Sequence, residues 1–518
     1  MPASKTSRRQ FLSDVGCGVL VASVGATMAT ELGLSKSLAA EPGKSLEFGA
    51  LESLVALMQE TPVSKLLPIL TEKLNSGTEL RTLVAAAALA NARTFGGEDY
   101  VGFHTLMAIA PAWHMSRELP SQQQALPVFK VLYRNTNRIQ EHGGRKSEVL
   151  HPVEAASGTQ TAESLREAIH SKDANKADAT FAALANVSTD EAFNALLQTV
   201  QETTEVHRTV LPYRAWDLLD IIGKEQAQTL LRQSVHYCVQ AENWNKNGEW
   251  NAPRTLLPKI LDEHHLLGKT PGTREADDAW VEQMSKTIFG STPQQAAEAV
   301  AAALEEGFAP AALGEAISLA ANQLILRDIG RTFRDETTNK PIGSVHGDSI
   351  GVHACDSANA WRNLARVSNT RNTFACLILG AYQVAWDRVN RGGDFLNWQP
   401  LPLARHVDDL KTDDPKMLLA ELETAIKGNL QARASAITAR FGRAGHDSRP
   451  IFDTMLKFAI SEDGSLHAEK YYRTVSDEFT NTRAAFRWRQ LIALARVTAS
   501  EYGRPAPGYA ESRALLKV

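Results

Sequence analysis

Apolar residues recur at intervals of three and four along most of this 518-residue chain, whereas alternating runs of Val, Ile and Thr are scarce. The first pattern places apolar side chains on one face of a helix, and the second would be needed for half-buried strands. Thr292-Pro293-Gln294-Gln295 predicts an N-cap with a capping box, Gly307 predicts the end of that helix, and Gly223 and Gly330 predict the ends of two others. With 43% hydrophobic residues, the chain can also bury a large core. The sequence therefore predicts an all-α protein.

Gly- and Pro-containing stretches interrupt this periodicity at 141–160, 268–278 and 391–403, and they predict linkers. The last of them suggests a division of the chain. We expect a helical repeat-like main domain over residues 45–400 and a helical C-terminal region over residues 404–518.

The N-terminus carries a targeting signal. "SRRQFL" (residues 7–12) resembles the twin-arginine export motif, and a weakly apolar run rich in Gly and Ala follows it at 15–30, too weak for a confident membrane span. Ser37-Leu38-Ala39 is a small-x-small cleavage pattern, so residues 1–39 are predicted to be a signal peptide, with an uncleaved anchor as the alternative. We expect the mature protein to be periplasmic or otherwise extracytoplasmic, with the twin-arginine machinery as a partner and no membrane attachment after cleavage. Cargo of this pathway crosses folded, which favours a preloaded cofactor.

Charge and cysteine content exclude several classes. The 55 basic and 59 acidic residues give a net charge of −4 with no long run of one sign, so neither a nucleic-acid backbone nor an anionic membrane is a predicted partner. Beyond the signal peptide, Cys238, Cys355 and Cys376 lack C-x-x-C spacing and allow at most one disulfide.

A histidine precedes an Ala-Trp pair three times. His104 and His207 are each followed by seven residues and then Ala-Trp, and His353 by six residues and then Ala-Trp. A short polar break and a second apolar helix follow each segment. This indicates a helix-turn-helix unit that occurs three times, in a solenoid or another multi-helix architecture.

Two interpretations of these histidines remain open. In the structural one, each imidazole braces the turn between stacked helices and the Trp fills the same gap in each unit. In the functional one, His104, His207 and His353 meet around one pocket and bind a transition metal such as iron, copper or zinc. Distances of about 4 to 6 Å between the histidines would favour the functional interpretation, whereas a binding scaffold would tolerate the loss of any of them.

The third unit carries more polar residues than the others. Ser349, His353, Asp356 and Asn363 fall on one narrow helical face, with a predicted cap ending at Ser349. Asp356 is therefore a candidate ligand or an orienting partner of His353, and His346 is a further candidate on nearly the same face. A solvated stripe is the alternative interpretation.

Other chemistries lack their motifs. No G-x-S-x-G, P-loop, H-E-x-x-H or strand-associated G-x-G-x-x-G occurs, so no nucleotide cofactor is predicted. The C-terminal "DGSLHAEKYYRTVSDEF" predicts an amphipathic helix in which His467 is a possible further ligand.

The segments "GEDYVGFHTLMAIAPA" and "VHGDSIGVHACDSANAWRNLA" resemble the questin-oxidase-like helical proteins and the helical modules found beside Rieske iron-sulphur domains. The resemblance covers about residues 80–390 and implies an all-helical oxidoreductase. The chain lacks the paired C-x-H and C-x-x-H ligands of a Rieske cluster, so such an enzyme would need an external electron donor. We therefore predict a metal-dependent oxidoreductase acting on a small organic substrate, with a non-enzymatic helical scaffold as the alternative.

Overall fold

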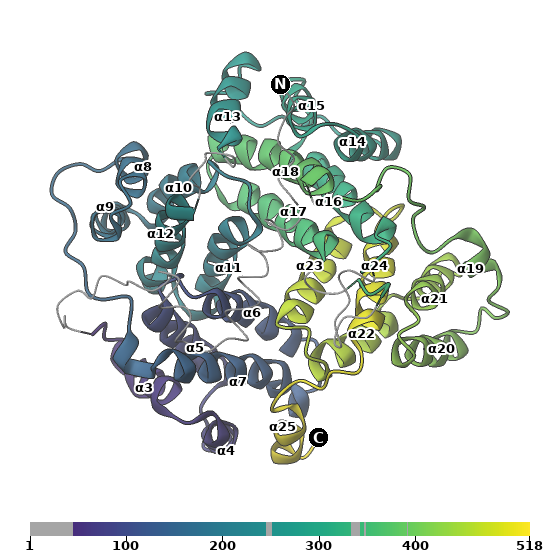
Figure 1. Cartoon of the computed structure of the whole chain (residues 1–518), viewed down its shortest axis with the longest axis horizontal. Helices are drawn as coiled ribbons and strands as arrows, with labels where there is room; N and C mark the ends of the chain where they lie inside the picture. The colour runs from purple at the N-terminus through teal and green to yellow at the C-terminus, as the bar shows by residue number, and fades with distance from the viewer. Residues whose placement is uncertain (1–44, 245–250, 333–341, 346–348, 391) are drawn as a thin grey trace.

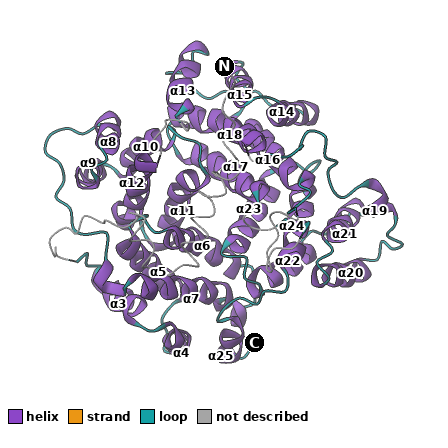
Figure 2. Cartoon of the chain, viewed as in Figure 1, coloured by secondary structure: helices purple, strands orange, loops and turns teal. Residues whose placement is uncertain are grey.

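A computed structural model describes residues 45–244, 251–332, 342–345, 349–390 and 392–518. The structure is 73% helical, and the described residues contain no strand, only two isolated bridges. This confirms the predicted all-α, multi-helix architecture. Figure 2 shows the helices linked by loops and short turns.

The helices of the first half are α3 (Glu52–Glu60), α4 (Val63–Asn75), α5 (Leu80–Phe95), α6 (Tyr100–Ser116), α7 (Ala125–His142), α8 (Ala162–His170), α9 (Ala174–Val187), α10 (Thr189–Val200), α11 (Val206–Ile222) and α12 (Ala227–Trp244). Those of the second half are α13 (Ala252–Glu263), α14 (Asp278–Gly290), α15 (Pro293–Glu305), α16 (Pro310–Arg327), α17 (Ile350–Val367), α18 (Thr370–Asn390), α19 (Ala404–Asp408), α20 (Pro415–Lys427), α21 (Gln431–Arg443), α22 (Arg449–Ser461), α23 (His467–Asn481), α24 (Trp488–Glu501) and α25 (Tyr509–Leu516).

Four of these helices, α6, α11, α17 and α23, form a closed inner ring. Each packs against the next, and α23 packs back against α6 (Figure 1). Every inner helix packs against two outer helices that are its neighbours in the sequence: α5 and α7, α10 and α12, α16 and α18, and α22 and α24, with α10 touching α11 through Phe193 and Trp216. The outer helices of adjacent units also touch, so four three-helix units close into a ring, not an open solenoid.

Local signals in the sequence agree with the helix ends. Thr292 forms the predicted capping box with Gln295, and its helix α15 ends at Glu305, shortly before Gly307. Ser349 caps α17 through its side chain, and Gly223 follows the last residue of α11. The three predicted linkers fall mainly outside the α-helices, as expected where Gly and Pro interrupt the helical pattern.

The ring closes through buried contacts between the fourth unit and the first. Lys130 of α7, 2% exposed, pairs with Glu469 of α23 at 2.6 Å and donates to the carbonyl oxygens of Ala459 and Glu462. Helices on both sides of the predicted boundary at residues 400–404 thus pack together. Among the described residues, no helix is long and apolar enough to cross a membrane.

A candidate four-histidine centre

Four histidines converge where the N-terminal parts of the inner helices meet. His104, His207, His353 and His467 lie in the first or second turn of α6, α11, α17 and α23. Around the ring, centroids of successive imidazoles are 4.7, 6.1, 5.2 and 5.5 Å apart. We call this group the four-histidine centre.

Hydrogen bonds fix the tautomers of three of these imidazoles. Nδ1 of His104 lies 2.7 Å from the carbonyl oxygen of Tyr100, and Nδ1 of His467 lies 3.1 Å from that of Ser465. Nδ1 of His207 lies 2.7 Å from a carboxylate oxygen of Glu205. Because these oxygens can only accept, each Nδ1 carries the proton, and each neutral imidazole presents the lone pair of Nε2.

The Nε2 atoms of the four imidazoles approach one another in two pairs, and in the pair of His104 and His207 both nitrogens present a lone pair. Nε2 of His104 lies 3.1 Å from Nε2 of His207, and Nε2 of His353 lies 3.2 Å from Nε2 of His467. Two acceptors attract each other at this distance only with a proton or a cation between them. Two nitrogens bound to one metal at 2.0 to 2.1 Å lie about 3.3 Å apart in a tetrahedral site, so the spacing within each pair suits a chelated ion.

The distance between the two pairs of Nε2 atoms is larger than the Nε2–Nε2 distance within either pair. Within the described part of the chain, only His170, Glu202 and Glu242 place three potential ligand atoms within 4.8 Å of one another. Binding of one ion by all four histidines therefore requires the pairs to move toward each other.

The His170 group is better explained as an ion-pair network. Arg254 pairs with both Glu202 and Glu242, and Arg208 lies within 4.0 Å of both carboxylates. Two guanidinium groups already neutralise these acids, which disfavours a further cation at that place.

Burial keeps His104 of the four-histidine centre in its neutral form. Burial lowers the pKa of His104 well below 6.5, and the nearby charges of Lys470, His207 and His467 lower it further. Burial alone would raise the pKa of Glu205, but His207, Tyr237 and the Arg208 N–H outweigh that effect and bring it to about 2. Glu205 is therefore an ionised acceptor that orients His207.

A second polar layer lies one to two helical turns below the histidines. Asp356 of α17, 4% exposed, accepts a hydrogen bond from Thr474 of α23 at 2.9 Å. Burial raises the pKa of Asp356, although nearby cations, Lys470 first, oppose this. Arg214 of α11 reaches the same Thr474 hydroxyl at 3.5 Å.

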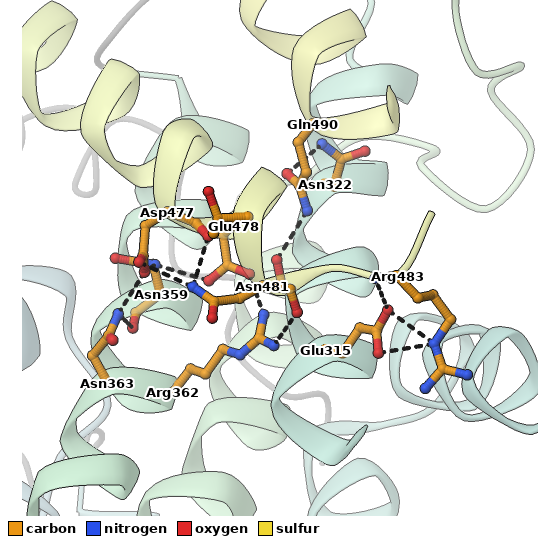
Figure 3. A network of polar contacts seen from close by, with 12 residues as sticks. Glu315, Asn322, Asn359, Arg362, Asn363, Asp477, Glu478, Asn481, Arg483 and Gln490 are labelled. Carbon is orange, nitrogen blue, oxygen red and sulfur yellow. Dashed lines mark hydrogen bonds and ion pairs between the residues drawn. The ribbon is translucent and has the colours of Figure 1, made fainter. Parts of the chain in front are cut away.

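The polar face of α17 is directed at α23 and away from solvent. Asn359 and Asn363 both donate to Asp477, and Arg362 pairs with Glu478 at 2.5 Å (Figure 3). The alternative of a solvated stripe is therefore wrong, because α23 covers this side of the helix.

The structure thus brings His104, His207 and His353 together and places Asp356 one turn below His353. His346 lies outside the described residues. His467 completes the ring, yet Val475 and Ser476 stand where the other units have Ala-Trp, so the repeat could not identify it. The only available signal was a histidine at the start of an amphipathic helix.

The tryptophans of the three units do not share one environment. Trp361 is fully buried and donates to Gln383, whereas Trp216 is partly buried and stacks on Phe193, and Trp113 is partly buried. The recurrence of Ala-Trp after each histidine is therefore not explained by a Trp that fills the same gap in each unit.

Comparisons with protein-family models, curated proteins and solved structures gave no significant match.

Proposed function

We propose that the four-histidine centre binds one transition metal ion and that the protein is a metal-dependent oxidoreductase. One observation carries the proposal: two Nε2–Nε2 contacts of 3.1 and 3.2 Å within one ring of imidazoles, three of which are protonated at Nδ1. A merely structural cluster would gain nothing from the lone pairs of His104 and His207 facing each other.

The chain's own residues would orient the ligands. Glu205 and the carbonyl oxygens of Tyr100 and Ser465 hold Nδ1–H and direct Nε2 inward. Four imidazole nitrogen donors suit iron, copper or zinc. When bound, a redox-active ion would supply electron transfer to or from a small organic molecule, with reducing equivalents exchanged with an external electron donor.

The donor set supports a functional ion more than a structural one. Structural zinc sites are generally built to complete a fold, whereas here the helical ring already has an extensive core. Ring separations of 4.7 to 6.1 Å are also close to the range that we set for a shared site.

X-ray absorption spectroscopy of chelator-treated protein reloaded separately with Fe(II), Cu(II) and Zn(II) tests this proposal. We expect three or four imidazole nitrogens at about 2.0 to 2.1 Å from the metal, together with a reversible spectral change on reduction and reoxidation of the iron or copper form. Oxygen-only coordination would contradict the metal site, and binding of zinc alone would contradict the oxidoreductase.

We also propose twin-arginine export, which rests on Arg8 and Arg9 in "SRRQFL" and on Ser37-Leu38-Ala39. Replacing both arginines with Lys should leave the precursor in the cytoplasm. Residues 1–44 lie outside the described part, so cell fractionation with an antibody to the mature chain is the test. Normal export of the Lys-Lys variant would contradict it.

A further inference from the structure

Two buried cations lie directly below the four-histidine centre. Arg214 follows His207 by seven residues on α11, about two helical turns, and so lies on the same face. Lys470 follows His467 by three residues on α23, which places it within one turn of that face. Arg214 is 1% exposed and Lys470 is 3% exposed.

Neither cation has a full set of hydrogen bonds, although the charge of Asp356 acts on both and the Arg214 guanidinium lies 4.7 Å from the centroid of the Tyr213 ring. Nε and Nη1 of Arg214 have no hydrogen-bond partner among the described residues; Asp217 lies 3.7 Å from Nη1, and Thr474 is at the outer limit for Nη2. In the described part of the chain, no residue forms a hydrogen bond or ion pair with the Lys470 ammonium.

A second buried lysine shows how a buried ammonium group is fully paired within this protein. Lys130, equally inaccessible, has three oxygen partners at 2.6 to 2.7 Å. Burying a charge without such partners costs several kcal/mol. Burial lowers the pKa of Lys470 to about 8, with Asp356 opposing and Arg214 adding to the decrease, so most molecules still carry this charge at pH 7.

The corresponding positions of the other two inner helices carry no polar side chain. Pro111 of α6 and Ala360 of α17 follow their histidines by seven residues, and they occupy the positions that correspond to Arg214 and Thr474. Both side chains are small, and neither offers an acceptor to the guanidinium or the ammonium group.

We propose that Arg214 and Lys470 together bind the carboxylate group of an anionic organic substrate beside the four-histidine centre. A carboxylate has two oxygens that can accept from a guanidinium and an ammonium at once. The inference rests on the proposed function for the reaction itself, but the anion site exists in the chain without the metal.

Ligand-observed NMR titrations with acetate, and with its neutral isostere acetamide, test the site. The mature protein would be titrated before and after treatment with a chelator, beside Lys470→Met and Arg214→Met. We expect acetate binding in both parent samples, at least tenfold weaker binding in each variant, and no acetamide binding at the same concentrations. Lys457→Met, which removes an exposed lysine of α22, should bind acetate as the parent does.

Acetate affinity within twofold of the parent in Lys470→Met would overturn the inference, as would equally tight acetamide binding. If Arg214→Met fails to fold by circular dichroism, Lys470→Met decides alone. Metal content is measured separately: anion binding that survives the chelator and depends on Lys470 supports this site even in a protein that holds no metal. Acetate binding that disappears with the metal would contradict it.

Discussion

Two buried polar clusters share the helices α17 and α23, and they differ in whether each donor faces an acceptor within the protein. In the lower cluster, amide and guanidinium donors of Asn359, Arg362 and Asn363 face the carboxylates of Asp477 and Glu478 (Figure 3). We call it the asparagine-arginine network.

The four-histidine centre and the two buried cations below it, Arg214 and Lys470, show the opposite arrangement. There, the Nε2 lone pairs of His104 and His207 face each other, Nε and Nη1 of Arg214 have no hydrogen-bond partner among the described residues, and no described residue forms a hydrogen bond or ion pair with the Lys470 ammonium. Complementary groups offset the free-energy cost of their desolvation by bonding to each other, whereas mismatched groups require a ligand to offset that cost. The comparison assigns helix attachment to the network and ligand binding to the centre.

Breaking the network should have the largest effect on stability. Arg362→Met leaves the buried Glu478 carboxylate without its guanidinium partner, so we expect a loss of about 3 to 5 kcal/mol in the free energy of unfolding. Urea denaturation followed by circular dichroism measures it. Arg366→Met removes an exposed arginine of the same helix that donates to Asn363 and Asn481, and it should change stability by about 1 kcal/mol or less; equal losses in the two variants would refute this assignment.

Two buried histidines should respond to pH in opposite directions. Burial disfavours the charged form of His236, but Asp178 and Glu98 outweigh it and raise its pKa to about 9. Its contribution, about 3 kcal/mol, is fully present below pH 6.5 and is lost as the pH rises through 9. His104, whose pKa is lowered, costs stability as the pH falls below 6.5, because only the unfolded chain then gains its proton.

Unfolding midpoints measured at pH values between 5 and 9.5 test the predicted direction of both effects. His236→Gln should flatten the alkaline loss, and His104→Gln should flatten the acid loss. An alkaline profile that is the same in the parent and His236→Gln would show that His236 is not the group that titrates.

Removing a buried charge that has no ion-pair partner should have the smallest effect on stability, and this effect should be stabilising. Lys470→Met deletes a buried ammonium that has no ion-pair partner among the described residues, so we expect stability to rise by about 1 kcal/mol. Thermal unfolding of the metal-free forms gives the difference. A loss as large as that of Arg362→Met would mean that Lys470 belongs to a stabilising network.

Local patterns in the sequence predict much of this fold, because capping and periodicity are encoded by neighbouring residues. Thr292, Ser349 and Gly223 mark helix ends where the structure has them. Closure of the ring could not be predicted, since it depends on contacts such as Lys130 with Glu469, which lie more than three hundred residues apart. The recurrence of His before Ala-Trp identified three histidines of the centre, but α23 has lost that signature. Arg214 and Lys470 were missed because only burial distinguishes them from surface cations.

Elemental analysis of the purified mature protein beside His353→Ala and His467→Ala is the most direct test of the central claim, that the four histidines form a metal centre. We predict about one transition metal ion per chain in the parent and a large loss of metal in both variants. The far-ultraviolet circular dichroism spectrum should stay helical in all three, because the ring's core does not depend on the ion. His446→Ala, which removes a histidine remote in sequence from the centre and bonded to the Asp413 carbonyl oxygen, should retain the parent's metal. Absence of stoichiometric metal in the parent, or equal metal in parent and variants, would contradict the account.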